Sequence, residues 1–170
     1  MARTKNGQGR DAIALLKADH DKVRELLGEL EETTERATGK REKLLATIEQ
    51  ELKLHTKIEE EIFYPAFRDA AKKKDDKDLY YEAIEEHHVV DLVLPEMKKT
   101  AVDSDEFSAK AKVLKDLVEH HAEEEESEMF PRARKLMGHD ELRRLGDELA
   151  KAKESGQKNS LFGRVSKLVS

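Results

Sequence analysis

Residues 55–65 read HTKIEEEIFYP and residues 121–131 read HAEEEESEMFP, so the chain contains one pattern twice. Each copy begins with a histidine, has a glutamate four positions later (Glu59 or Glu125), and closes with an aromatic residue and a proline. Residues four positions apart lie on one face of a helix. Each copy therefore points an imidazole and a carboxylate in the same direction, as a pair of metal ligands requires.

The repeat extends upstream of both copies. His20, in the segment ADHDKVREL, lies 35 residues before His55. His87, in the segment EEHHVVDLV, lies 34 residues before His121. A nearly constant period of this size, with two helical patterns inside it, indicates one helix-loop-helix hairpin used twice. Each of the four helices then carries one histidine on its inward face.

Composition predicts an all-α protein. Apolar residues make up 37% of the chain and charged residues 41%, Gly and Pro number only 8 and 3, and β-branched residues form no alternating runs. Helices with short connections pack as an antiparallel up-down bundle. We expect a flexible N-terminus at 1–10, a four-helix bundle at 11–137, a short fifth C-terminal helix at 138–154 and a flexible amphipathic tail at 155–170.

The charge and the cysteine count exclude several classes of function. A net charge of −6 argues against a nucleic-acid partner, because no basic stripe is available to neutralise phosphates. The sequence has no cysteine, which excludes disulfides and thiol catalysis. No apolar run is long enough for a signal peptide or a transmembrane segment, so we expect a cytoplasmic protein.

The histidines have two interpretations. In an antiparallel bundle, mid-helix residues lie at similar depth, so the four imidazoles converge and the two glutamates reach between them. Burying these ionisable groups without compensation would cost several kcal/mol, and imidazole with carboxylate suits iron, manganese or zinc. The alternative is a metal-free helical interaction module with ordinary core histidines and solvated i,i+4 pairs.

Four residues near the candidate ligands each have two possible roles or locations. His88 and His120 each adjoin a candidate ligand but are rotated about 100° from it, so we expect them at a helix interface or in solvent. Glu60 and Glu126 fit either acceptors for histidine N–H groups or a solvated acidic face.

The segments ADHDKV, HTKIEEEIFYP, EEHHVVD and HHAEEEESEMFP together resemble the hemerythrin-like (HHE cation-binding) family over about residues 11–136. The resemblance implies a hemerythrin-like bundle that holds two non-haem iron ions, oxo- or hydroxo-bridged, with manganese or zinc less favoured, and dioxygen or peroxide as the small-molecule ligand. By motif position it implies the metal ligands His20, His55, Glu59, His87, His121 and Glu125.

Position 91 departs from the family pattern. Oxygen-carrying hemerythrins place a further histidine four residues after the third-helix ligand, and this chain has Asp91 there. We include Asp91 as a candidate ligand and expect a protein that binds, senses or reacts with dioxygen or its reduced products, not a simple carrier. A di-iron oxidoreductase that decomposes peroxide, as a catalase does, is the alternative at the same centre.

Overall fold

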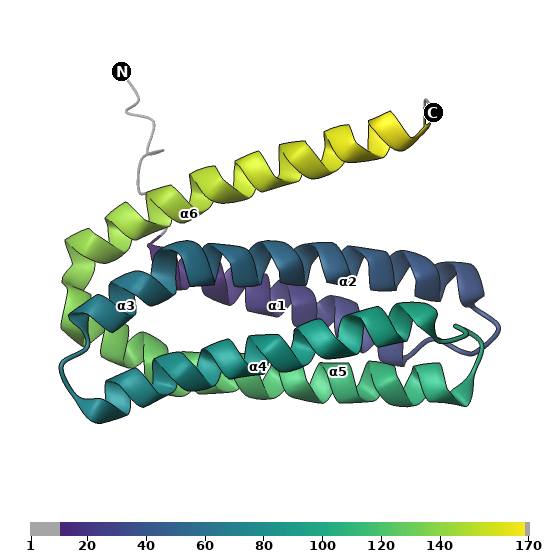
Figure 1. Ribbon diagram of the computed structural model, residues 1–170, viewed down its shortest axis with the longest axis horizontal. Coiled ribbons are helices and arrows are strands. Elements are labelled where there is room, and N and C mark those ends of the chain that lie inside the picture. The colour runs from purple at the N-terminus through teal and green to yellow at the C-terminus, as the bar shows by residue number, and fades with distance from the viewer. Residues whose placement is uncertain (1–10, 169–170) are drawn as a thin grey trace, which may run out of the picture.

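The computed structural model describes residues 11–168, with side chains described for residues 11–158. Over this range the chain is an antiparallel four-helix bundle, which confirms the predicted fold (Figure 1). The predicted flexible segment at 1–10 lies outside the described residues. The bundle helices are α1 (Ala12–Glu31), α2 (Thr38–Ile58), α4 (Lys74–Lys99) and α5 (Asp105–Glu124). α2 continues into η1 (Glu59–Phe63) and α3 (Tyr64–Ala70), and α5 into η2 (Glu125–Met129) and α6 (Phe130–Leu168).

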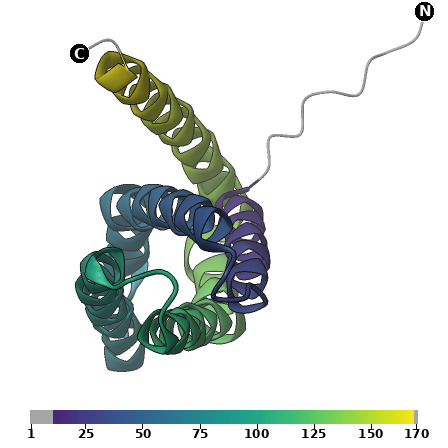
Figure 2. The same ribbon diagram turned by 90° about the vertical axis from the view of Figure 1, so that its right-hand side faces the viewer.

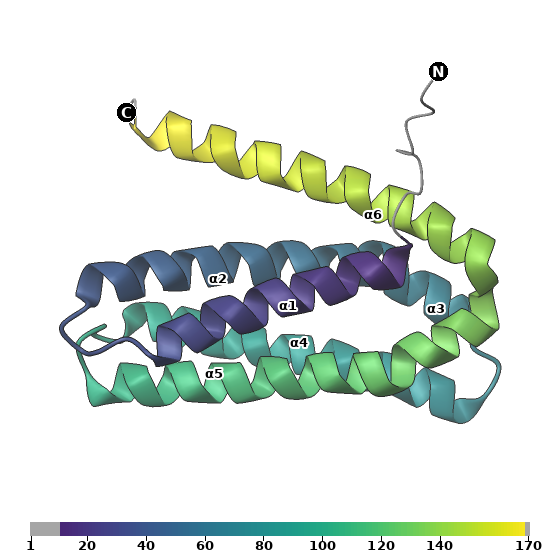
Figure 3. The same cartoon turned by 180° about the vertical axis from the view of Figure 1, so that it is seen from behind.

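Local sequence signals begin two of these helices. Asp11 caps α1 by accepting a 2.8 Å hydrogen bond from the Ala14 N–H, and Ser104 caps α5 by accepting from the Phe107 N–H at 3.1 Å. Viewed along the bundle, α1 packs between α2 and α5, and α4 lies beside α5 (Figure 2). The side view from behind shows α1 in front, between α2 and α5 (Figure 3). Within residues 11–168, no helix combines the length and apolar character that a bilayer crossing demands.

The apolar core is divided into two clusters with a polar layer between them. One cluster lies toward the loops that join α1 to α2 and α4 to α5, and it includes Val23, Leu52, Val90 and Val118. The other lies toward α3 and α6 and includes Leu16, Ile58, Ala83 and Met129. Each bundle helix passes from one cluster to the other across a single buried histidine. The four histidines therefore lie at one depth, as the repeat predicts.

Gly138 redirects the chain after the bundle. Its φ of 76° lies in the left-handed region that favours glycine, and α6 is interrupted there. The residues that follow, 139–168, are called the C-terminal arm. The arm folds back over α1 and α2, with Leu142, Leu145 and Leu149 buried in the cluster near α3 (Figures 1 and 3). The predicted fifth helix is present, but it continues to Leu168 instead of ending at residue 154.

Candidate metal centre

Six of the predicted ligands converge in the polar layer. They form two groups whose donor atoms lie within 4.8 Å of one another, and Glu59 belongs to both groups. Every member is at least 94% buried. The first group is His20, His55, Glu59 and Glu125, and the second is Glu59, His87 and His121.

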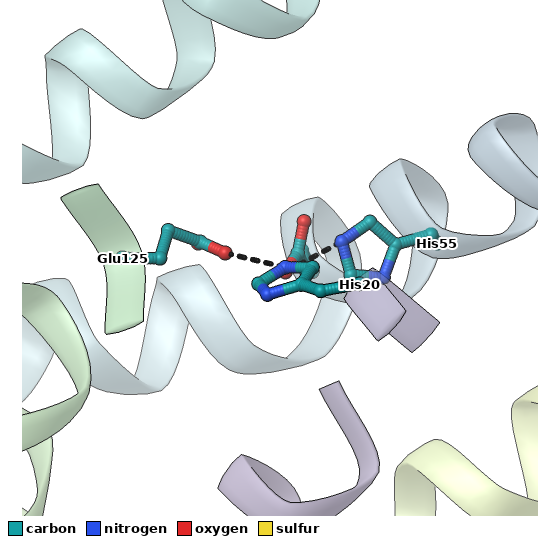
Figure 4. Close-up of side chains that lie close together, drawn as sticks. His20, His55 and Glu125 are labelled. Atoms are coloured by element: carbon teal, nitrogen blue, oxygen red, sulfur yellow. Dashed lines mark ion pairs between the residues drawn. The ribbon is translucent and has the colours of Figure 1, made fainter. Parts of the chain in front are cut away.

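All four imidazoles direct Nε2 toward the two glutamates. His20 Nε2 lies 3.1 Å from Glu125 Oε2, and Figure 4 shows this pair with His55 beside it. Glu59 lies between a histidine of α2 and a histidine of α4. Its Oε1 is 3.2 Å from His55 Nε2 and its Oε2 is 3.3 Å from His87 Nε2. His121 Nε2 is 3.7 Å from Glu125 Oε2 and 3.2 Å from His87 Nε2. Two donor sets that share a carboxylate can hold a pair of cations close together.

The outer nitrogen of each ring, Nδ1, faces a second carboxylate. A carboxylate that accepts the Nδ1 proton leaves the Nε2 lone pair free to bind a metal. Three of the rings have a carboxylate oxygen within 2.9 Å of Nδ1, whereas Nδ1 of His55 and Oδ2 of Asp19 are 3.5 Å apart and make no hydrogen bond to any of the described residues. Glu60 and Glu126, for which two roles were open, are both such acceptors, whereas the side chains of His88 and His120 are exposed. The four pairs are His20 with Glu126 at 2.9 Å, His55 with Asp19 at 3.5 Å, His87 with Glu60 at 2.8 Å and His121 with Glu86 at 2.7 Å.

Several inward atoms lack a hydrogen bond. Among the described residues, Nε2 of His20 and His55, Oε1 of Glu59 and Oε2 of Glu125 are buried and make none, although their neighbours lie within 3.3 Å. Unpartnered buried polar atoms are unfavourable, and here nitrogen lone pairs and carboxylate oxygens point at one another. A cation between them satisfies both kinds of atom, so the residues present fit a metal.

Electrostatics favour the same conclusion. Burial and the neighbouring Glu125 carboxylate raise the pKa of Glu59 well above its ordinary value. Burial alone would also raise the pKa of Glu125, but His121, His20 and His55 together outweigh burial and lower that pKa. Burial lowers the pKa of His55 to about 4, so this ring is neutral at pH 7 and can bind a metal. Without a cation, the two glutamates take up protons unequally.

Both glutamates occupy the first position of a π-helical segment. The Tyr64 N–H bonds to the carbonyl of Glu59, and the Phe130 N–H to the carbonyl of Glu125, so the hydrogen bonds span five residues. π-helical insertions of this kind are frequent at functional sites. A proline, Pro65 or Pro131, follows each segment and supplies no N–H. The segment brings the fifth residue after each glutamate back to the same face of the helix.

Tyr64 is a site residue that sequence reasoning missed. On a regular α-helix it would lie about 140° around from Glu59, but the π-helical segment turns it inward. Its hydroxyl donates a 2.8 Å hydrogen bond to Glu125 Oε1 and lies 3.4 Å from Glu59 Oε2 and 3.3 Å from His87 Nε2. The available signal was the repeat itself, because the equivalent position in the second copy is Phe130.

A family model for the hemerythrin HHE cation binding domain matches residues 11–133, the part of the chain that contains all six converging candidate ligands. The chain belongs to the hemerythrin HHE cation-binding family. A solved structure of an HHE cation binding domain-containing protein from Mycobacterium kansasii is similar over 90% of this chain and 91% of that one, with a TM-score of 0.78 and 27% sequence identity.

A curated relative is named a DNA nickase, from Nostoc sp. (strain PCC 7120 / SAG 25.82 / UTEX 2576). It is 27% identical over 143 residues, which is 84% of this chain. The chain spans 39% of that protein's length.

Asp91, included as a candidate ligand from the sequence, is exposed and belongs to neither of the two donor sets. The inward stripe of α4 runs through His87, Val90 and Leu94, whereas Asp91 is exposed. The residue three positions after the histidine takes the inward place, because an apolar side chain can be buried there without compensation. Asp91 stays in water, where a carboxylate is solvated.

A small cavity adjoins the HHE centre on its apolar side. Its volume is about 20 Å³, room for one water-sized molecule. Apart from the imidazoles, its walls are mostly aliphatic, so it suits a small uncharged molecule. The four histidines line it together with Val23, Leu52, Thr56, Val90 and Val118.

Proposed function

We propose that this HHE protein holds two non-haem iron ions and reacts there with dioxygen or its reduced products. The observation that carries the proposal is the pair of buried donor sets that share Glu59, with the Nε2 atoms of four imidazoles directed at two carboxylates. Mixed imidazole and carboxylate ligation suits iron or manganese better than calcium or magnesium. The family match supports a bound cation, and the motif resemblance favours iron.

The chain's own residues have three roles in this proposal. The imidazoles and glutamates bind the ions, and the carboxylates on each Nδ1 orient the rings. The cavity of about 20 Å³ admits a small molecule to the same point and excludes larger ones. The hydroxyl of Tyr64 can supply or hold a proton at Glu125 Oε1, 2.8 Å away. Iron, when bound, supplies the redox change that no side chain of this centre provides.

Elemental analysis and an absorption spectrum of aerobically purified protein test the proposal. We expect about two iron ions per chain and near-ultraviolet bands that disappear on removal of the metal. A single zinc ion per chain would overturn it. The absence of any bound metal would also overturn it and would favour the metal-free interaction module.

A catalase-like reaction is the second candidate. Dismutation converts two molecules of hydrogen peroxide into one of dioxygen and two of water, so it needs no outside reductant. The sequence has no cysteine that could relay electrons, which favours a reaction of this kind over sustained reduction of an oxidant. Steady release of dioxygen from peroxide by the iron-loaded protein supports it. Consumption of peroxide without any dioxygen would contradict it.

We further propose a small-molecule ligand and a cytoplasmic location, and no nucleic-acid partner. The net charge of −6 opposes binding to a polyanion. Because the Nostoc relative is named a DNA nickase, the direct test uses DNA. Supercoiled plasmid incubated with the iron-loaded protein should stay supercoiled, and labelled duplex should show no binding at low salt.

A further inference from the structure

The C-terminal arm contacts the bundle beside the metal centre. After the change of direction at Gly138, its buried leucines hold it over α1 and α2, and its far end diverges from the bundle (Figure 2). The arm lies beyond residues 11–133, which the family model matches. Any role it has at the centre is therefore an addition to the family's bundle.

Lys153 of the arm reaches the back of the centre. It lies one helical turn after the buried Leu149 and pairs with Asp19 Oδ1. The other oxygen of Asp19, Oδ2, lies 3.5 Å from Nδ1 of His55. One carboxylate thus connects the arm with an imidazole whose opposite nitrogen faces Glu59.

Asp19 differs from the other carboxylates that face an Nδ1. Its side chain is 9% exposed, whereas those of Glu126, Glu60 and Glu86 are 21%, 43% and 24% exposed. A carboxylate this deeply buried depends on a cation for its stability. Its cation comes from the arm, whereas Glu126 takes Arg24 from within the bundle.

A second contact fixes the position of the arm near His55. A Cβ atom added to Gly156 would lie 2.6 Å from Cδ1 of Leu54, so the arm backbone packs directly on the residue that precedes the ligand. Gly156 is three positions after Lys153, on the same side of the helix. The arm is therefore held against α2 at the level of His55 by packing as well as by charge.

We infer that the C-terminal arm positions a metal ligand: Lys153, acting through Asp19, holds the His55 imidazole with Nε2 directed at the ions. Lys153 is a positioning residue and contacts no ligand atom itself. Without it the unpaired Asp19 turns toward water, the 3.5 Å contact between its Oδ2 and Nδ1 of His55 is lost, and the ring of His55 can rotate more freely. The expected effect of Lys153 on iron binding rests on the proposed function. Its expected effect on the orientation of the His55 ring does not.

The test compares full-length Lys153→Met, Lys153→Arg and Lys151→Met. Methionine keeps the length and packing of Lys153 without its charge, arginine restores the charge, and Lys151 is exposed on the same helix. We expect Lys153→Met to lose iron to a chelator about 10- to 100-fold faster than wild type, and the other two variants to behave as wild type. Loss of iron from Lys153→Met at the wild-type rate would overturn the inference.

Two further measurements separate positioning from a general loss of structure. In an Asp19→Asn background, Lys153→Met should have no additional effect, because the lysine acts through that carboxylate; an equal effect in both backgrounds would contradict the inference. In the metal-free protein, the ring nitrogen NMR signals of His55 should shift in Lys153→Met and not in Lys151→Met. If wild type binds no iron, the proposed function fails while the NMR result still decides this inference.

Discussion

Tyr64 donates a 2.8 Å hydrogen bond to Glu125, which lies 61 positions later in the sequence and on the opposite hairpin. The equivalent residue of the second repeat, Phe130, has no hydroxyl. The two rings otherwise correspond, since Tyr64 stacks on His87 with centroids 5.5 Å apart and Phe130 on His20 at 5.8 Å. One hydroxyl group therefore makes the two halves of a repeated site chemically different.

Tyr64→Phe should preserve the fold and the iron content but change the reactivity of the centre. Loss of a hydrogen bond to a buried carboxylate should destabilise the metal-free protein by about 1.5–3 kcal/mol. The absorption spectrum and the rate of peroxide consumption should change as well. Tyr81→Phe is the control, because Tyr81 is 61% exposed. A spectrum and a rate equal to wild type in Tyr64→Phe would exclude the phenol from the centre.

Glu59→Gln should reduce iron from about two ions per chain to one or none, because Glu59 belongs to both donor sets. The metal-free variant should be as stable as wild type or more stable, since it removes one of two buried carboxyl groups. Iron analysis and thermal unfolding measure the two effects. Glu61→Gln, at an exposed position in the same segment, should change neither. Full retention of iron by Glu59→Gln would contradict a shared ligand.

Acid should destabilise the metal-free protein through His55. Its folded-state pKa is about 4, below the ordinary value of 6.5, so between these values the unfolded chain binds the extra proton. Stability therefore falls as pH is lowered through this window, by up to about 3 kcal/mol. Urea unfolding at pH 7 and pH 4.5 should show a smaller loss for His55→Gln than for wild type.

The comparison with His55→Gln isolates the histidine. The raised pKa of Glu59 acts in the opposite direction, because a proton held more tightly in the folded state favours folding as pH falls. Glu59 is present in both proteins, so its effect largely cancels in the difference. Identical pH dependence in the two proteins would show that His55 is not buried in neutral form.

Val118→Leu should slow the entry of small ligands without loss of iron. Val118 lines the cavity of about 20 Å³, and one added methylene fills most of it. We expect the rate of peroxide consumption, or of azide binding to the iron-loaded protein, to fall about tenfold or more. A tenfold fall corresponds to an entry barrier higher by about 1.4 kcal/mol. Val113→Leu, at a position 50% exposed, serves as the control. An unchanged rate with the cavity filled would indicate another route to the centre.

The helical bundle and all six converging candidate ligands could be predicted from the residues alone. Helical spacing is local, so a histidine and a glutamate four positions apart share a face wherever the helix is placed. The repeat then placed His20, His55, His87 and His121 at mid-helix, and an antiparallel arrangement brought them to one depth. These inferences needed the period of the α-helix and the approximate lengths of the hairpins, both of which are readable from the residues.

Other features of the site depend on local breaks in helical period and on contacts between distant segments. The π-helical segment after Glu59 breaks the regular period, so Tyr64 faces the centre although an α-helical register turns it away. Small rotations of α4 decide whether position 90 or 91 is buried, and Asp91 is the residue left in water. The pairing of Lys153 with Asp19 depends on the direction the chain takes after Gly138, and such a contact between distant segments leaves no periodic signal in the sequence.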